Sequence, residues 1–340
     1  MRLRVLVILF AALAVVLGSA QTAVAASRHS QGASPRVPQV TVRPGDPGYN
    51  LIPASQAFKG PIPRAPKTPY FRGGAHSKTT VPATSTPRRI PAATASPKIQ
   101  LFNSINLTSL TSQINGSTGT PPDSTGSIGP TAYVEIVNSA IAVWDRTNLS
   151  QTAVSSLASF LNAPGLALCD PQVQWDAAAN RWIFSILYCN INDTTQGFFL
   201  GWSKTSDPSN LLANNTVSGP GTGGWCGYVF LTGHNLFDYQ KLGHNSGYMI
   251  IGGNYYSENP AGNPNPPFVT SQIIWFQLPG LGDTSCSLAG LSYNYTAQNP
   301  LKNGDGVTKT FTPVPVNTFS AATDGYVFSS YDAGGNVQAP

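Results

Sequence analysis

Aspartate side chains at the expected starts of β-strands are the residues of this chain that could do acid–base chemistry. They are Asp123, Asp238 and Asp324. Glycoside hydrolases use two neighbouring carboxyl groups, one as the acid and the other as base or nucleophile. These aspartates would form such a group if their strands all start at one face of the fold. The simpler interpretation of each is a turn aspartate that accepts backbone hydrogen bonds.

Two histidines and one tryptophan complete the candidate ligand-binding residues. His234 and His244 flank Asp238 in "TGHNLFDYQKLGHN", where they would form a metal site or an acid–base pair, or simply lie in exposed loops. Trp225, in the glycine-rich stretch "GPGTGGWCGY", is expected to expose its ring to a ligand, whereas the other tryptophans fall at core positions. The cysteine spacing matches no zinc pattern, and no nucleotide-binding loop is present, so we predict no metal and no cofactor.

The elements that must position these side chains are β-hairpins. Residues 170–189, "DPQVQWDAAANRWIFSILYC", give a strand, a turn at 177–180 and a second strand headed by Trp182. The same order occurs at 126–145, 238–256 and 317–332, with Tyr133, Tyr248 and Tyr326 as the aromatic heads. Third strands follow at 197–205 and 271–278, and residues 152–162 are the best helix candidate. Such repetition is typical of propeller blades; the alternative is a β-sandwich with coincidental turns.

Four cysteines allow two disulfides in three pairings. If the chain reverses within residues 177–180, antiparallel partners have residue numbers that sum to 357 or 358. Cys169 and Cys189 sum to 358, so we predict that they are bonded to each other. Cys226 and Cys286 are then left as the second pair.

The two ends of the chain differ in charge from the body. Residues 1–25 read as a signal peptide, with a basic start and a short apolar run before Ala23-Val24-Ala25. Residues 26–98 contain 11 Lys and Arg against one acid, and 13 prolines, which predicts a disordered, basic, Pro-rich linker. Residues 99–340 carry 6 Lys and Arg against 13 acids. We therefore expect a secreted protein, extracellular or periplasmic, with no transmembrane segment after signal cleavage.

Several sequence blocks resemble a family of secreted bacterial β-propeller proteins whose members are mostly uncharacterised. These blocks are "PPDSTGSIGPTAYVEIVNSAIAVWD", "DPQVQWDAAANRWIFS", "GWSKTSDPS" and "FDYQKLGHNSGYMIIGGNYY", and the resemblance covers residues 121–335. It implies an architecture like that of sialidase and kelch propellers, but no catalytic residues that can be transferred. The turn "HNSGY" departs from the family pattern, and the chain has no sialidase Asp-box.

Together these observations predict an all-β chain, a β-propeller of four-stranded antiparallel blades after the linker. The body accounts for about four to five blades, fewer than usually close a ring, so we expect an incomplete or truncated propeller. We expect a binding or structural module for a glycan or an anionic cell-envelope polymer, not for nucleic acid. The basic linker is the element that would attach to an anionic polymer, unless it is only a solvated spacer.

The alternative to a binding module is a glycan-active hydrolase or lyase with its site on the central propeller face. The two are distinguished by whether Asp123, Asp238 and Asp324 come within about 10 Å of one another together with a histidine or arginine.

Overall fold

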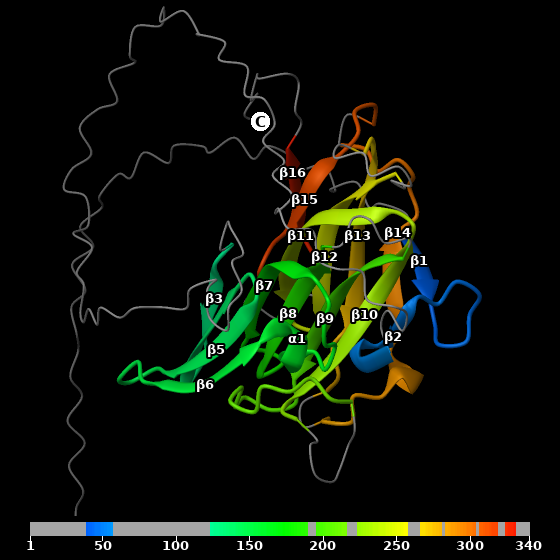
Figure 1. Ribbon diagram of the computed structural model, residues 1–340. Coiled ribbons are helices and arrows are strands. Elements are labelled where there is room, and N and C mark those ends of the chain that lie inside the picture. Colours follow the sequence, from blue (N-terminus) through cyan, green and yellow to red (C-terminus); the bar gives the residue numbers. More distant parts are fainter. Residues whose placement is uncertain are drawn as a thin grey trace, which may run out of the picture. The chain divides into compact units, whose positions relative to one another are not determined.

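The computed structural model describes residues 39–56, 123–189, 195–215, 223–257, 266–280, 283–303, 306–318 and 324–330. These residues form antiparallel β-sheets, which confirms the prediction of an all-β chain (Figure 1). Closure of the sheets into a ring stays a prediction. The predicted signal peptide lies outside the described residues.

Three sheets follow one another along the chain, and in each the successive strands are neighbours. The first consists of β3 (Thr125–Ile128), β4 (Ala132–Val137), β5 (Ala140–Asp145) and β6 (Gln151–Ser156). The second contains β7 (Leu168–Asp176), β8 (Arg181–Tyr188), β9 (Gln196–Ser203) and β10 (Trp225–Gly233). The third contains β11 (Leu236–Asn245), β12 (Tyr248–Tyr256), β13 (Phe268–Gln277) and β14 (Tyr293–Thr296). A last pair consists of β15 (Phe311–Pro315) and β16 (Val327–Ser330).

We call β3, β7, β11 and β15 the lead strands, because each comes first in its run of paired strands. Strand β3 packs against β7, β7 against β11, and β11 against β15. His244 at the end of β11 also forms a parallel bridge with Asn317, just after β15. Strand β15 approaches β12 so closely that a Cβ on Gly252 would lie 2.2 Å from the Pro313 carbonyl oxygen. The lead strands are therefore neighbours in chain order, although they belong to different sheets.

The aromatic heads predicted from the sequence fall where the second strand of each pair begins. Tyr133 and Trp182 are the second residues of β4 and β8, and Tyr248 is the first residue of β12. Tyr326 immediately precedes β16. Their burial differs, because Trp182 is fully buried whereas the Tyr326 side chain is 52% exposed.

The hydrophobic core lies between consecutive sheets, and strand β8 contributes to both layers of it. Trp182, Phe184 and Ile186 pack toward the first sheet, with Val134 and Ile136 of β4 in the same cluster. The alternate residues of β8 belong instead to the cluster shared with the third sheet, and they are Ile183 and Leu187. Side chains alternate along a strand, so a strand with a core on both faces is apolar at nearly every position. This explains why six of the eight residues of β8, "RWIFSILY", are apolar.

Helices are few and short among the described residues. They are the 3₁₀ turns at Ala54–Gln56 and Leu288–Gly290 and the helix α1 at Leu157–Phe160. The prediction of a helix over residues 152–162 is largely wrong, because β6 occupies its first half. Ser156 ends that strand and caps α1, its hydroxyl accepting a 3.1 Å hydrogen bond from the Ser159 N–H. The Ser and Thr residues of this stretch favour a strand and a cap over a helix interior.

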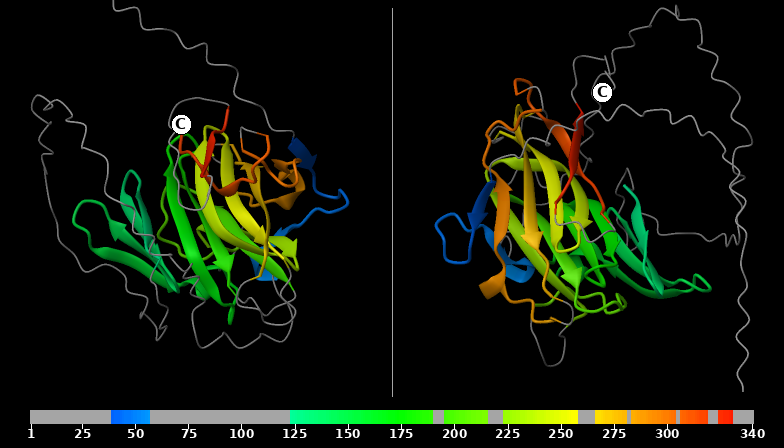
Figure 2. Two further views of the ribbon diagram at one scale, coloured as in Figure 1. Left: turned by 90° about the horizontal axis from the view of Figure 1, so that it is seen from above. Right: turned by 180° about the vertical axis from the view of Figure 1, so that it is seen from behind.

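Part of the predicted disordered linker is ordered. Strand β1 (Gln39–Val42) pairs with the outer strand β14 of the third sheet, and β2 (Leu51–Pro53) pairs with β10 of the second (Figure 2). The linker prediction is therefore wrong for residues 39–56. An edge strand forms one ladder only, so it tolerates the prolines that misled the sequence interpretation. The rest of residues 26–98 lies outside the described residues.

Both predicted disulfides are confirmed. The Cα atoms are 6.0 Å apart in Cys169–Cys189 and 5.3 Å apart in Cys226–Cys286. The assumed register holds at the turn, where Asp176 faces Arg181, but a bulge after Cys169 moves this residue opposite Leu187. Two disulfides fit an extracellular protein. Among the residues that the structure describes, no helix is long and apolar enough to cross a membrane.

The packing of β2 can be tested through Leu51, whose side chain is only 1% exposed. We expect Leu51→Ala to lower the free energy of unfolding by about 2–4 kcal/mol, because it leaves a cavity under the sheet edge. Ile128→Ala is the control, since Ile128 is 60% exposed and its loss should change stability by less than about 0.5 kcal/mol. Urea denaturation of the full chain measures both. Equal midpoints for Leu51→Ala and the wild type would show that β2 does not contribute to the core.

Candidate functional site

Three aspartates from different sheets gather at the starting ends of the lead strands. Asp123 lies two residues before β3, Asp170 near the start of β7, and Asp238 near the start of β11. Asp170 is hydrogen-bonded to the Asp123 side chain, and the negative charge of Asp238 acts on its carboxyl group. We call these three residues the acidic group. The packing of lead strands against one another brings them together, since they are far apart in the sequence.

Asn138 ties two members of the acidic group together. Its Nδ2 donates a 2.6 Å hydrogen bond to the Asp123 Oδ2, and its Oδ1 accepts a 2.8 Å bond from the Asp170 N–H. Asn138 lies in the turn between β4 and β5 and is buried. A buried amide with both ends bonded fixes the positions of its partners. The spacing between Asp123 and Asp170 is therefore set by the first sheet.

Asp170 is the member whose ionisation is most strongly perturbed. Burial, the charges of Asp238 and Asp123 and the hydrogen bond to Asp123 together raise its pKa to about 7, against an opposing effect of Lys241. Two carboxylates in contact cannot both ionise easily, so they share a proton. A carboxyl group that titrates near neutral pH can both donate and accept a proton under physiological conditions.

The backbone at the acidic group has a conformation that few residues adopt. Asp123, Asp170 and Tyr239 have φ angles of 45°, 48° and 58°, in the left-handed region. In β7 and β11 these residues lie at bulges, where the pairing register shifts. Thr312, with φ of 49°, stands at the corresponding shift in β15. A bulge redirects the side chains around it, and such strain in non-glycine residues is often found at functional sites.

Residues next to Asp238 complete the surroundings of the acidic group. The Tyr239 N–H donates to the Asp238 Oδ1 at 2.8 Å, while the Tyr239 ring is 51% exposed. The Lys241 Nζ lies 4.7 Å from the centre of that ring. Gln240 is buried and its Nε2 donates to the Asp170 carbonyl oxygen, but its Oε1 has no hydrogen-bond partner. The site thus combines carboxylates, an amide oxygen, one cation and an exposed aromatic ring.

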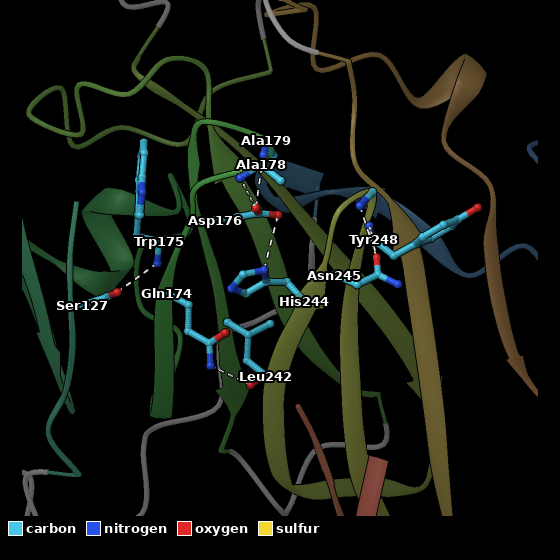
Figure 3. Close-up of polar contacts among 11 residues, drawn as sticks. Ser127, Gln174, Trp175, Asp176, Ala178, Ala179, Leu242, His244, Asn245 and Tyr248 are labelled. Atoms are coloured by element: carbon cyan, nitrogen blue, oxygen red, sulfur yellow. Dashed lines mark hydrogen bonds and ion pairs between the residues drawn. The ribbon is translucent and has the colours of Figure 1, made fainter. Parts of the chain in front are cut away.

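Side-chain bonds further along the lead strands hold them in register (Figure 3). The Trp175 N–H of β7 donates to the Ser127 Oγ of β3 at 2.9 Å, and the Gln174 Nε2 donates to the Leu242 carbonyl oxygen of β11 at 2.7 Å. Asp176 and His244 face each other across β7 and β11, with the Oδ2 and Nδ1 atoms 3.6 Å apart. These bonds bridge strands that share no ladder.

The structure brings only some of the predicted site residues together. Asp123 and Asp238 belong to the acidic group, whereas Asp324 is exposed just before β16 and no contact links it to them. His234 is exposed in the turn between β10 and β11. His244 lies at the far end of β11, buried beside Asp176 and not in an exposed loop. No histidine or arginine is among the charges that act on Asp170.

The expectation of an exposed Trp225 is wrong. Trp225 is the first residue of β10 and is fully buried, with its Nε1 donating to the Pro208 carbonyl oxygen at 3.1 Å. Its ring packs edge-on against Phe160 and Phe184. Arg181 faces Asp176 across the turn between β7 and β8 and is buried. Its guanidinium donates to the carbonyl oxygens of Ser203, Gly280 and Asp283, and so anchors the loop that precedes Cys286.

Asp170 is a site residue that the sequence analysis did not include, because it lies before Pro171 and resembles an ordinary turn aspartate. The available signal was its place at the start of a hairpin, equivalent to that of Asp238. The sequence does not show which lead strands are neighbours in the fold.

Among the described residues, no three carboxylate, imidazole or thiol groups are arranged to hold a metal ion.

Comparison with protein-family models finds no match, and comparison with curated proteins finds none either. The resemblance to secreted bacterial propellers therefore stays a prediction, and the function must be argued from the site.

The raised pKa of Asp170 predicts a specific pH dependence of stability. The folded protein keeps this proton up to about pH 7, whereas the unfolded chain releases it near pH 3.8. The stabilisation is complete below the unfolded value and is lost as the pH rises toward 7. Asp170→Asn cannot ionise, so we expect its stability relative to the wild type to increase between about pH 4 and pH 7.

Urea denaturation of both proteins across this pH range makes the measurement. Asp324→Asn is the matched control, because Asp324 is exposed and should show no such trend. Stability curves of wild type and Asp170→Asn that stay parallel over the whole range would contradict a raised pKa.

Proposed function

We propose that the chain forms part of an extracellular β-propeller that binds a glycan at the starting ends of its lead strands. The observation that carries this proposal is the gathering of Asp123, Asp170 and Asp238 beside the exposed ring of Tyr239. Carboxylate and amide oxygens accept hydrogen bonds from sugar hydroxyls, and an aromatic face packs against the apolar side of a sugar ring. Both kinds of contact are offered here within a few residues.

The arrangement of the sheets supports the propeller part of the proposal. Each four-stranded run is antiparallel with its strands in chain order, and its lead strand packs against the lead strand of the next run. Bulges with a left-handed residue stand near the start of β7, β11 and β15. Sheets packed around a line of lead strands are the arrangement of propeller blades. Ligands of such a fold would meet the lead strands at their shared end.

The charge distribution narrows the class of glycan. Three aspartates and a single lysine repel an anionic polymer from this end of the sheets. A neutral glycan or one with amino groups is the better partner here. An anionic envelope polymer fits the basic residues of the predicted linker instead.

A glycan-active hydrolase or lyase is the second candidate function, and one observation favours it. Asp123 and Asp170 are hydrogen-bonded to each other, and the pKa of Asp170 is raised to about 7. A carboxyl group that stays protonated near neutral pH is the kind of general acid that glycoside hydrolysis uses. Binding remains the leading proposal, because no histidine or arginine of the described residues is among the charges that act on Asp170.

Binding can be tested with the full mature chain. A glycan-array screen selects soluble oligosaccharides, whose affinities calorimetry then measures. We expect Asp238→Asn and Tyr239→Ala each to weaken binding about tenfold, because they remove a hydroxyl acceptor and a stacking ring. Tyr239→Phe keeps the ring and Asp324→Asn changes an exposed acid elsewhere, so both should bind like the wild type. Wild-type affinity in Tyr239→Ala and Asp238→Asn would refute the proposed site.

The enzymatic alternative makes a different prediction for the glycans that bind. If the chain is a hydrolase, incubation should release new reducing ends, and Asp170→Asn should slow this release by at least about 100-fold through loss of the acid. Chromatography of the products measures this directly. An intact glycan after long incubation with the wild type would leave the binding function and remove the enzymatic one.

A further inference from the structure

A cavity lies between the second and third sheets, apart from the acidic group. Its volume is about 600 Å³, which is within the range of small-ligand sites. Four aromatic side chains line it, namely Phe230, Tyr255, Tyr293 and Tyr295. None of the three aspartates of the acidic group lines this cavity. We call it the inter-sheet cavity.

The segment between β1 and β2 forms one wall of the inter-sheet cavity. Gly48 and Asn50 line it, and both are bonded to Tyr293. The Tyr293 hydroxyl donates to the Gly48 carbonyl oxygen at 3.1 Å and accepts a 3.3 Å bond from the Asn50 N–H. Gly48 has a φ of +83°, which other residues rarely adopt. This wall is therefore a built part of the fold, and not a loose end of the chain.

The lining of the inter-sheet cavity contains no charged residue. Its polar side chains are uncharged and come from the second and third sheets and the N-terminal wall, namely Asn50, Thr195, Thr232 and Gln272. Burial raises the pKa of Tyr255 and Tyr293, so their phenols stay protonated and neutral. A charged ligand would lose its hydration here without gaining an opposite charge. The cavity thus suits an uncharged ligand that offers both apolar faces and hydroxyl groups.

The inter-sheet cavity and the acidic group are separate, but one end of the β11–β12 hairpin connects them. Tyr255 of β12 is paired with Phe237, the residue that precedes Asp238 in β11. The rings of Tyr255 and Phe237 are in edge contact, with centres 5.0 Å apart. Side chains alternate along β11, so Phe237 and Asp238 point to opposite sides of the strand. One end of the β11–β12 hairpin thus contributes to both places.

We propose that the inter-sheet cavity is a second binding site, and that its ligand is an uncharged saccharide. The tyrosine rings supply stacking faces, and the amides and hydroxyls supply donors and acceptors without charge. The inference rests on the proposed function only in that both ligands are glycans. It concerns a different site and a narrower class of ligand, since amino sugars are proposed to bind at the acidic group as well.

Calorimetry of the full mature chain tests this site with two sets of probes. The neutral probes are hexasaccharides of glucose, xylose, mannose and N-acetylglucosamine, and the charged probes are hexamers of galacturonate and glucosamine. We expect a neutral hexasaccharide to bind, and Tyr295→Ala to weaken it about tenfold by removing a ring of the cavity wall. Tyr295→Phe is the matched control and should stay within about threefold of the wild type. Circular dichroism and Tm show whether each variant is folded.

The same titrations with Asp238→Asn separate this inference from the proposed function. Loss of neutral binding in Tyr295→Ala alone supports the inter-sheet cavity and counts against the acidic group. Loss of neutral-hexasaccharide binding in Asp238→Asn alone overturns the proposal of a site in the cavity and leaves the proposed function standing. Binding of charged hexamers only also overturns the cavity site. If no probe binds the wild type, both proposals fail. Should Tyr295→Ala be unfolded, Gln272→Leu replaces it, because this partly exposed side chain lines the same wall.

Discussion

Contact between lead strands of different sheets is the constraint on which the rest of the described structure depends. The lead strands β3, β7 and β11 belong to separate sheets, so ladder hydrogen bonds do not join them, and side chains take over that role. Ser127, Gln174 and the Asp176–His244 pair bridge β3, β7 and β11 in this way. Buried polar groups must find partners, so each bridge favours one register between the sheets. The acidic group exists only because that register brings the starting ends of the lead strands together.

His244, which belongs to one of these bridges, and Asp170, which belongs to the acidic group, make the stability of the fold depend on pH in opposite directions. Burial lowers the pKa of His244, with Asp176 acting against it, so the neutral imidazole is favoured in the folded state. Its contribution to stability is present above the unfolded pKa of 6.5 and is lost as the pH falls below it. Asp170 behaves in the reverse sense, because its pKa is raised. Acid therefore places a charge on the buried His244 imidazole, which destabilises the fold there, while it relieves repulsion within the acidic group. The two ends of these strands respond to pH in opposite directions.

Much of the local structure could be predicted from the sequence, because local rules determine it. Alternation and turn residues predicted the hairpin within residues 126–145, which the structure contains as β4 and β5, and the reversal at 177–180 led to both disulfides. The bulge at Asp170 escaped prediction, because only Leu168 and Cys169 precede it in β7, and two residues are too few to show a change of alternation. Trp225 was misplaced for a related reason. The glycines before it signal a loop, but the strand begins at the tryptophan itself, and its burial depends on Phe160 and Phe184 from elsewhere in the chain.

Residues 39–56 show why composition alone misjudged the N-terminal segment. A segment rich in proline and basic residues has too little apolar surface to form a core of its own, which is why it resembles a linker. It needs no core of its own here, because β14 and β10 offer unpaired outer edges and Leu51 inserts into an existing one. An added strand gains backbone bonds from a finished sheet and contributes few side chains. Pairing with two different sheets then carries the intervening residues across the space between them. A wall of the inter-sheet cavity arises in this way from a stretch whose composition predicted no structure at all.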